Sequence, residues 1–279
     1  MARNLYWIEW LKHIEKSKKK YEVPTIDAKI DTDGFIIPGY SGLKINIEKS
    51  LSNLDKLGQW DEKCLVLEEI EPHVGISNLI PAPIRQGNNN KPMISFIINI
   101  PGHNDKLLEV INILREHKIK STFFIEGTWA HKFPILAQKI RDDGHEIGNG
   151  TYSYPDLRGM TMEGIRWELT KTNEIIRKEL GIRPKLFTPP KGEYDERVIY
   201  MAALERMNTV LSTIHTLEPK EKKATESMKK TISNLEGGKI ISLNPMDTSI
   251  SDLLQLLKNI EHRQYKIGKL SELLSVRHV

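Results

Sequence analysis

The chain has 279 residues, of which 39% are hydrophobic and 28% are charged, a balance typical of globular proteins. This length predicts one large domain, or a large domain with a smaller one. The formal net charge of +4 would attract anionic polymers such as teichoic acids or nucleic acid. Basic and acidic residues are mostly interspersed, however, so we expect no nucleic-acid partner. Cys64 is the only cysteine, which excludes an intrachain disulfide and a cysteine-based zinc finger.

Residues 1–22 form a lysine-rich segment in which Trp7, Trp10, Leu11 and Ile14 have the spacing of one helix face. We expect a packed or frayed helix rather than a helix on a membrane surface. No apolar run reaches the length of a membrane span, and Glu9 interrupts the stretch in which a signal peptide would have its apolar core. The chain as it starts therefore predicts a cytoplasmic protein, although a segment upstream would reverse that expectation.

Residues 23–91 predict a small α+β unit with a linker. Ile47, Leu51, Leu54 and Leu57 have helical spacing, and the apolar run 64–67 predicts a strand in which Cys64 is a small buried hydrophobe. Two prolines and the segment 87–90 then carry turn signals, which predict the linker to a third region, 92–279.

From residue 92 onward, apolar strands alternate with amphipathic helices. The expected strands are 93–99, 121–126, 146–149, 186–187, 209–213, 240–243 and 265–270, and the clearest helices are 107–117, 134–143 and 162–180. These seven β/α steps favour a parallel sheet wound right-handedly. The pattern alone does not decide whether that sheet stays open or closes into a barrel.

Three segments carry a resemblance to a known family: 121–127 (STFFIEG), 144–157 (GHEIGNGTYSYPDL) and 183–192 (RPKLFTPPKG). Their order and spacing resemble the polysaccharide deacetylase (NodB-homology) family over residues 92–275. The resemblance implies a distorted (β/α)7 barrel with its site at the carboxyl ends of the strands, and a place in the cell envelope. The preceding small unit, with segments 81–84 and 95–99, is similar to a deacetylase-like subfamily of spore-forming bacteria.

The family removes N-acetyl groups from cell-wall glycans or chitin with a divalent metal, usually zinc, which polarises the acetyl carbonyl and activates water. Such a metal needs three protein ligands and one open position. Every position that matches a functional residue of the family has lost its group here: Asn99 stands at the base, Ile100, Gly150 and Tyr154 at the three ligands, Thr188 at an arginine, and Asn244 at the acid. The resemblance therefore implies a metal-dependent fold, while these residues predict that no metal cofactor is bound.

A replacement metal site is one alternative. His103 and Asp105 follow the first barrel strand and His215 follows a later one, although a solvated turn or helix cap is the favoured interpretation of such residues. His145 is expected to be a framework histidine rather than a ligand.

The expected cleft wall is the second feature of the site. Tyr154, Pro189, Pro190 and Lys191 are the candidate substrate-binding residues, because aromatic faces, hydroxyls and a cation suit sugar rings and anionic groups. For Tyr154, and for Tyr152 and Tyr194, the slightly favoured explanation is that they are partly buried wall residues that fill the space left by the metal.

Three hypotheses follow. The favoured one is a catalytically inactive protein that binds cell-wall glycan or serves a structural role in the envelope or in sporulation. The alternative is an active carbon–nitrogen hydrolase with a rearranged metal site. The third is a cytoplasmic protein that has lost both export and activity. No phosphate-binding GxxxxGK[ST] loop, GxGxxG segment after a strand or GxSxG elbow is present to suggest another enzyme class.

Overall fold

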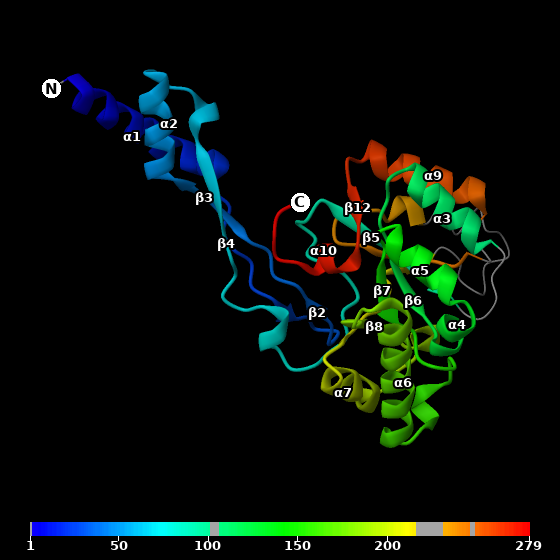
Figure 1. Ribbon diagram of the computed structural model, residues 1–279. Coiled ribbons are helices and arrows are strands. Elements are labelled where there is room, and N and C mark those ends of the chain that lie inside the picture. Colours follow the sequence, from blue (N-terminus) through cyan, green and yellow to red (C-terminus); the bar gives the residue numbers. More distant parts are fainter. Residues whose placement is uncertain (1, 101–105, 216–230, 246–248) are drawn as a thin grey trace.

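The computed structural model describes residues 2–100, 106–215, 231–245 and 249–279. It shows a curled α/β barrel from which an arm extends, with the N-terminus at the far end of the arm (Figure 1). The arm contains helices α1 (Ala2–Tyr21) and α2 (Ile47–Leu57) and the antiparallel pair β3 (Gly42–Asn46) and β4 (Val66–Ile70). A second short pair, β1 (Lys29–Ile30) and β2 (Ile36–Ile37), lies between the arm and the barrel.

The barrel is a curved sheet of parallel strands in the order β10-β11-β5-β6-β7-β8-β9, with β12 also paired to β5. Its strands are β5 (Met93–Ile100), β6 (Thr122–Ile125), β7 (Glu146–Asn149), β8 (Leu186–Phe187), β9 (Asn208–Thr209), β10 (Ile214–His215), β11 (Ile240–Leu243) and β12 (Lys266–Gly268). The covering helices are α3 (Leu107–Glu116), α4 (Gly127–Lys132), α5 (Pro134–Asp142), α6 (Met162–Leu180), α7 (Glu196–Leu204), α9 (Ile250–His262) and α10 (Leu270–Leu274). This architecture confirms the fold predicted from the β/α alternation and the family resemblance.

The linker predicted before the barrel takes part in its sheet. Ile84 is fully buried and forms a parallel bridge to Val210, just after β9, while Gln86 bridges to Lys239, just before β11. Residues 84–86 therefore lie between β9 and β11 and help to close the barrel.

Two apolar layers hold the barrel together. An outer layer lies between the sheet and its helices, and an inner layer fills the barrel with Phe124, Ile97, Ile240 and their neighbours. A Cβ on Gly148 would lie 2.4 Å from the Phe124 ring, so the glycine on β7 makes room for the phenylalanine that fills the centre.

The arm has its own small core, in which Trp10 and Ile14 of α1 pack with Leu51 and Leu54 of α2. Trp10 and Ile14 are 6% and 1% exposed, whereas Trp7 and Leu11 are 39% and 40% exposed. The expected packing face was thus correct for the first pair and wrong for the second. Leu11 is turned about 100° from Trp10 around the helix, whereas Trp7 is on the side of Ile14, two turns earlier, where its indole N–H donates to Asp55 of α2 at 3.3 Å.

Cys64 is free and half-buried at the edge of the arm core, so the prediction of a fully buried cysteine was too strong. The expected strand 64–67 begins later, at Val66, because residues 62–64 form a 3₁₀ turn capped by Asp61. In the described parts of the chain, no helix is both long and apolar enough to cross a membrane.

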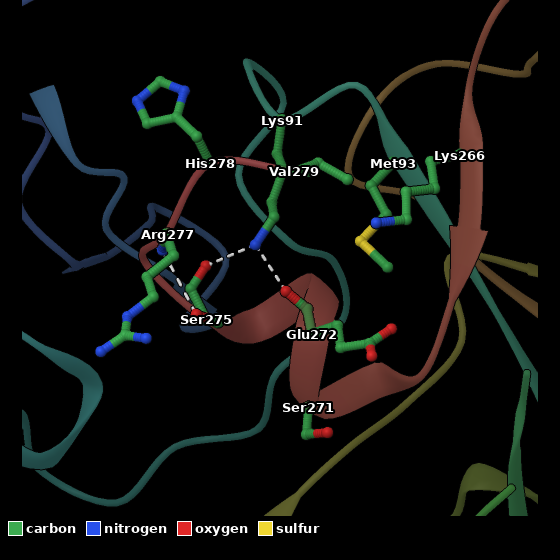
Figure 2. A pocket seen from close by; sticks show the side chains of 9 residues that line it. All are labelled: Lys91, Met93, Lys266, Ser271, Glu272, Ser275, Arg277, His278 and Val279. Atoms are coloured by element: carbon green, nitrogen blue, oxygen red, sulfur yellow. Dashed lines mark hydrogen bonds between the residues drawn. The ribbon is translucent and has the colours of Figure 1, made fainter. Parts of the chain in front are cut away.

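A cavity of about 400 Å³ lies at the amino ends of β5 and β12, beside Met93 and Lys266 and opposite the strand ends of the expected site. Figure 2 shows the ammonium group of Lys91 bonded to the carbonyl oxygens of Glu272 and Ser275, which end α10. Through these two bonds the buried lysine caps the last helix, and burial lowers the pKa of Lys91 to about 8.

The residues after α10 connect the barrel to the arm. Ser41 donates its backbone N–H to the carbonyl of Val276 at 2.8 Å, and the ring of His278 packs against Tyr40 with centroids 4.4 Å apart and the rings tilted by 39°. The His278 backbone N–H also donates to Glu69 in β4 at 3.1 Å. The C-terminal tail therefore fixes the base of the arm against the barrel.

Candidate functional site

The carboxyl ends of neighbouring strands meet at one end of the barrel. The registers of β11 on β5, β5 on β6, β6 on β7 and β7 on β8 bring five residues to this end: Asn244, Asn99, Glu126, Gly150 and Thr188. Four of them were predicted as site positions, and the structure confirms that they share one end of the sheet. Ligand sites of parallel sheets form at such carboxyl ends.

Asn99 and Ile100 are consecutive on β5, so their side chains point to opposite faces. Ile100 is 1% exposed and belongs to the outer apolar layer with Ile98 and Leu107. Asn99 lies on the inner face, and its Oδ1 is buried without a hydrogen-bond partner among the described residues. Ile100 thus faces the helices as part of the core, while Asn99 places an acceptor without a partner among the described residues at the end of the barrel.

Gly150 follows β7 and lies against β6. Its N–H donates to the carbonyl of Ile125 at 2.9 Å, and a Cβ at this position would be 3.0 Å from that same oxygen. A histidine at residue 150 would require the backbones to separate by a few tenths of an ångström. The fit is tight, but the main loss at this position is the absent donor side chain itself.

The loop after Gly150 contains two non-glycine residues with left-handed backbone, Thr151 at φ +69° and Tyr154 at φ +59°. Such conformations cost about 1–3 kcal/mol each, and most for a β-branched residue. Hydrogen bonds to Glu168 of α6 offset part of this cost. Its buried carboxylate accepts the N–H groups of Tyr152 at 2.7 Å and Ser153 at 2.9 Å, and the Ser153 hydroxyl at 2.7 Å. We call these contacts the Glu168 clamp.

The other side of this loop is bonded to the start of α4, where Gly127 and Thr128 donate to the carbonyls of Thr151 and Tyr152, both at 3.0 Å. Asn149 also accepts the Thr151 N–H at 2.8 Å. The loop is thus held from both sides in one conformation.

Tyr154 spans the distance to the neighbouring loop. Its hydroxyl accepts the backbone N–H of Lys191 at 3.2 Å, and Lys191 itself has φ +56° within the short helix η4 (Pro190–Gly192). The Tyr154 side chain is half-buried, and the Lys191 side chain is exposed. This geometry uses the tyrosine hydroxyl to join two loops.

The remaining predicted wall residues have structural contacts. Pro189 and Pro190 are buried, and the Thr188 hydroxyl donates to the carbonyl of Val210 at 2.9 Å. The ring of Tyr152 packs edge-on against Trp167 at 5.0 Å, and Tyr194 packs against the apolar cluster of α6 and α7.

Sequence reasoning missed two carboxylates. Glu126 is 7% exposed at the end of β6, and its Oε2 accepts the Thr128 hydroxyl at 3.4 Å. Its position two residues after the inward-facing Phe124 was a usable signal. Glu168 lies within a helix, where no motif marks it.

His145 precedes β7 and is 6% exposed. Its Nδ1 accepts the N–H of Ser121 at 3.1 Å, and burial, followed by the positive charge of Lys120, lowers its pKa to about 4. The contact with backbone supports the expected framework role.

A catalytic zinc needs three donor side chains around one point. In the parts of the chain that the structure describes, no group of three histidine, cysteine, aspartate or glutamate side chains could hold a metal. Gly150 brings no donor, Ile100 faces the outer core, and the Tyr154 hydroxyl is bonded to a backbone amide. These residues do not fit the family's metal. His103 and Asp105 lie outside the described residues, and so does the side chain of His215.

Comparison with known proteins agrees with this fold. A family model described as polysaccharide deacetylase matches residues 88–210. The Bacillus subtilis protein YlxY is 38% identical over 91% of this chain and 80% of its own length. A peptidoglycan-N-acetylglucosamine deacetylase of Bacillus cereus is 32% identical over 48% of this chain and 48% of its own length.

Among solved structures, BA3943 from Bacillus anthracis is described as a pseudoenzyme of carbohydrate esterase family 4 (CE4). Its crystal structure has a TM-score of 0.86 and 31% identity, and the match covers 96% of this chain and 95% of that one. A mutant of BA3943 is described as having restored enzymatic activity. With its barrel, its strand-end residues and these matches together, the chain belongs to the polysaccharide deacetylase family, carbohydrate esterase family 4.

Proposed function

We propose that this chain is a non-catalytic member of its family, which binds N-acetylated cell-wall glycan in the envelope without hydrolysing it. The observation that carries the proposal is the missing donor set: Gly150 has no side chain, Ile100 belongs to the outer apolar layer, and the Tyr154 hydroxyl is bonded to the Lys191 amide. Without a metal or a base at Asn99, the site lacks the groups that would polarise an amide and activate water.

The family's own substrate class supports the glycan part. Asn99 offers a buried acceptor without a partner among the described residues, and Asn244 lies beside it across the β5–β11 register. The Lys191 side chain is exposed on the adjoining loop. An acceptor suits the N–H of an acetamido group or a sugar hydroxyl, and a lysine suits an anionic substituent.

Recovering catalysis by exchanging side chains would also require local adjustment around them. Ile100→Asp would direct a carboxylate toward the outer apolar layer, and Gly150→His would press on the carbonyl of Ile125. For the related BA3943, a mutant is described as having restored enzymatic activity.

Glycan binding is tested by NMR titration with N-acetylglucosamine oligomers. We expect shifts at the side-chain amides of Asn99 and Asn244, with a dissociation constant on the order of millimolar to tens of micromolar. Asn99→Ala should weaken binding about tenfold, the effect of one hydrogen bond. Asn208→Ala, an exposed asparagine at the opposite end of the sheet, is the matched control.

Two results would overturn the proposal. No shift at either amide would leave only a structural role for this end of the barrel. Release of acetate from N-acetylated oligomers, abolished by a chelator, would show an active hydrolase with a rearranged metal site.

A further inference from the structure

The net positive charge of this protein equals the net charge of its first helix, α1. Residues 1–21 contain six of the 41 basic side chains and two of the 37 acidic ones, which leaves 35 of each in the rest of the chain. The net charge of +4 therefore equals the net charge of the α1 segment, and the arm's end is basic on an otherwise neutral molecule.

The basic side chains point away from the arm core. Lys12, Lys16 and Lys19 are exposed and form no ion pair within the described residues, whereas Lys18 and Lys20 are paired with Glu15 and Glu62. Their spacing of four and three residues places the three unpaired lysines in one stripe along α1. The opposite face is occupied by Trp10 and Ile14 in the arm core.

The same exposed side continues into apolar residues toward the N-terminus. Ile8 and Leu11 are 54% and 40% exposed, and Ile8 is four residues before Lys12 in the same stripe. Tyr6 and Trp7 are also partly exposed but lie on the arm side of the helix, since Tyr6 stacks on Trp10 and the Trp7 indole N–H donates to Asp55 of α2 at 3.3 Å. Two large apolar side chains at one end of a basic stripe are not needed to bind a hydrophilic anionic polymer.

Aliphatic side chains next to lysines on one helix face are the composition of helices that lie in the interface of a bilayer. The aliphatic side chains enter the headgroup region, and the lysines contact anionic phosphates while their stems cover apolar surface. In Figure 1, α1 lies at the tip of the arm, away from the barrel, so a flat surface can reach it without contact with the barrel.

We propose that the exposed face of α1 docks the protein reversibly on a bilayer that contains anionic phospholipid. Neither half of the face suffices alone, since the apolar patch is short and the charge is modest. This inference does not depend on glycan binding at the barrel, because the two sites lie on different parts of the molecule.

Sedimentation with vesicles tests the proposal on the full chain. We expect binding to mixed phosphatidylcholine and phosphatidylglycerol vesicles, weaker binding in high salt, and little binding to phosphatidylcholine alone. Lys12→Gln, Lys16→Gln and Lys19→Gln together should weaken binding roughly a hundredfold, from about fivefold per lysine at such a surface.

Two further variants separate the contributions. Ile8→Gln with Leu11→Gln retains the charge and should also abolish most binding, because it removes the apolar part. A control that replaces the exposed barrel lysines Lys132, Lys185 and Lys258 with glutamine removes the same charge and should bind normally. All substituted side chains are exposed, and circular dichroism checks that the helices persist.

Several outcomes would overturn the inference. They are failure of the folded protein to bind the mixed vesicles, equal binding to both kinds of vesicle, or an equal loss in the barrel-lysine control. Binding to a soluble anionic polymer but not to vesicles, or a dimer that hides α1 in solution, would assign this face to another partner.

Discussion

The Glu168 clamp should contribute substantially to the stability of the loop that replaces the metal site. Its carboxylate accepts three hydrogen bonds from Tyr152 and Ser153. Bonds to a charged acceptor contribute about 1.5–3 kcal/mol each, but Ser153 is exposed and water can replace part of them. At about 1 kcal/mol each, Glu168→Ala should lower the free energy of unfolding by about 3 kcal/mol.

Glu168→Gln separates charge from geometry. One oxygen of the amide can still accept both backbone N–H groups, and its nitrogen can donate to the Ser153 hydroxyl, so we expect a loss of about 1 kcal/mol. Glu174→Ala, on an exposed position of the same helix, is the matched control and should cost less than about 0.5 kcal/mol.

Urea denaturation measures the global effect, and hydrogen exchange at the Tyr152 and Ser153 amides measures the local one. The clamp predicts faster exchange at both amides in Glu168→Ala and near-normal exchange in Glu168→Gln. Unchanged exchange in the alanine variant, or an equal loss of stability in the Glu174 control, would refute the reasoning.

Three further predictions concern single residues. The pKa of His145 is lowered to about 4 in the folded protein. The stabilisation that neutral His145 contributes to the free energy of unfolding is therefore complete above the unfolded pKa of about 6.5 and is lost as the pH falls from there toward 4. His145→Asn, which keeps an acceptor for the Ser121 amide, should remove about 2 kcal/mol of this pH dependence of unfolding, after allowing for solvent screening; an unchanged slope would contradict it. Tyr154→Phe should cost at most about 1 kcal/mol and speed exchange at the Lys191 amide, and an unaffected amide would show that the 3.2 Å contact is not a bond in solution. Gly148→Ala should cost about 2 kcal/mol in thermal or urea unfolding through overpacking of Phe124, and Phe124→Leu should restore part of it; two additive losses would argue against the contact.

The alternation of strands and helices could be predicted because each barrel strand is a short apolar run between amphipathic helices. The bounds of β7, β11 and α6 agree with the sequence pattern. The expected strand 209–213 differs from the structure at its end. Only Asn208–Thr209 pairs with β8, and Val210 forms its bridge with Ile84 instead. A linker that joins a sheet from far along the chain leaves no local signal.

Side-chain direction on β5 was also beyond the sequence. The strand is apolar at nearly every position because both of its faces are buried, so periodicity cannot show which residues face inward. The sequence therefore predicted the loss of the base at Asn99 and of a metal ligand at Ile100, but not that Ile100 faces the helices. Nor did it indicate the Glu168 clamp, which depends on α6 packing beneath the loop.

The central claim is that this site does not hold the family's metal, and metal content tests it most directly. Purified protein is equilibrated with zinc, passed through a desalting column, and analysed for zinc per chain by elemental analysis. The account predicts far less than one zinc per chain, because Gly150, Ile100 and Tyr154 provide no convergent donors. About one tightly bound zinc per chain, removed by substitution of His103, Asp105 or His215, would contradict it and point to a rearranged catalytic site.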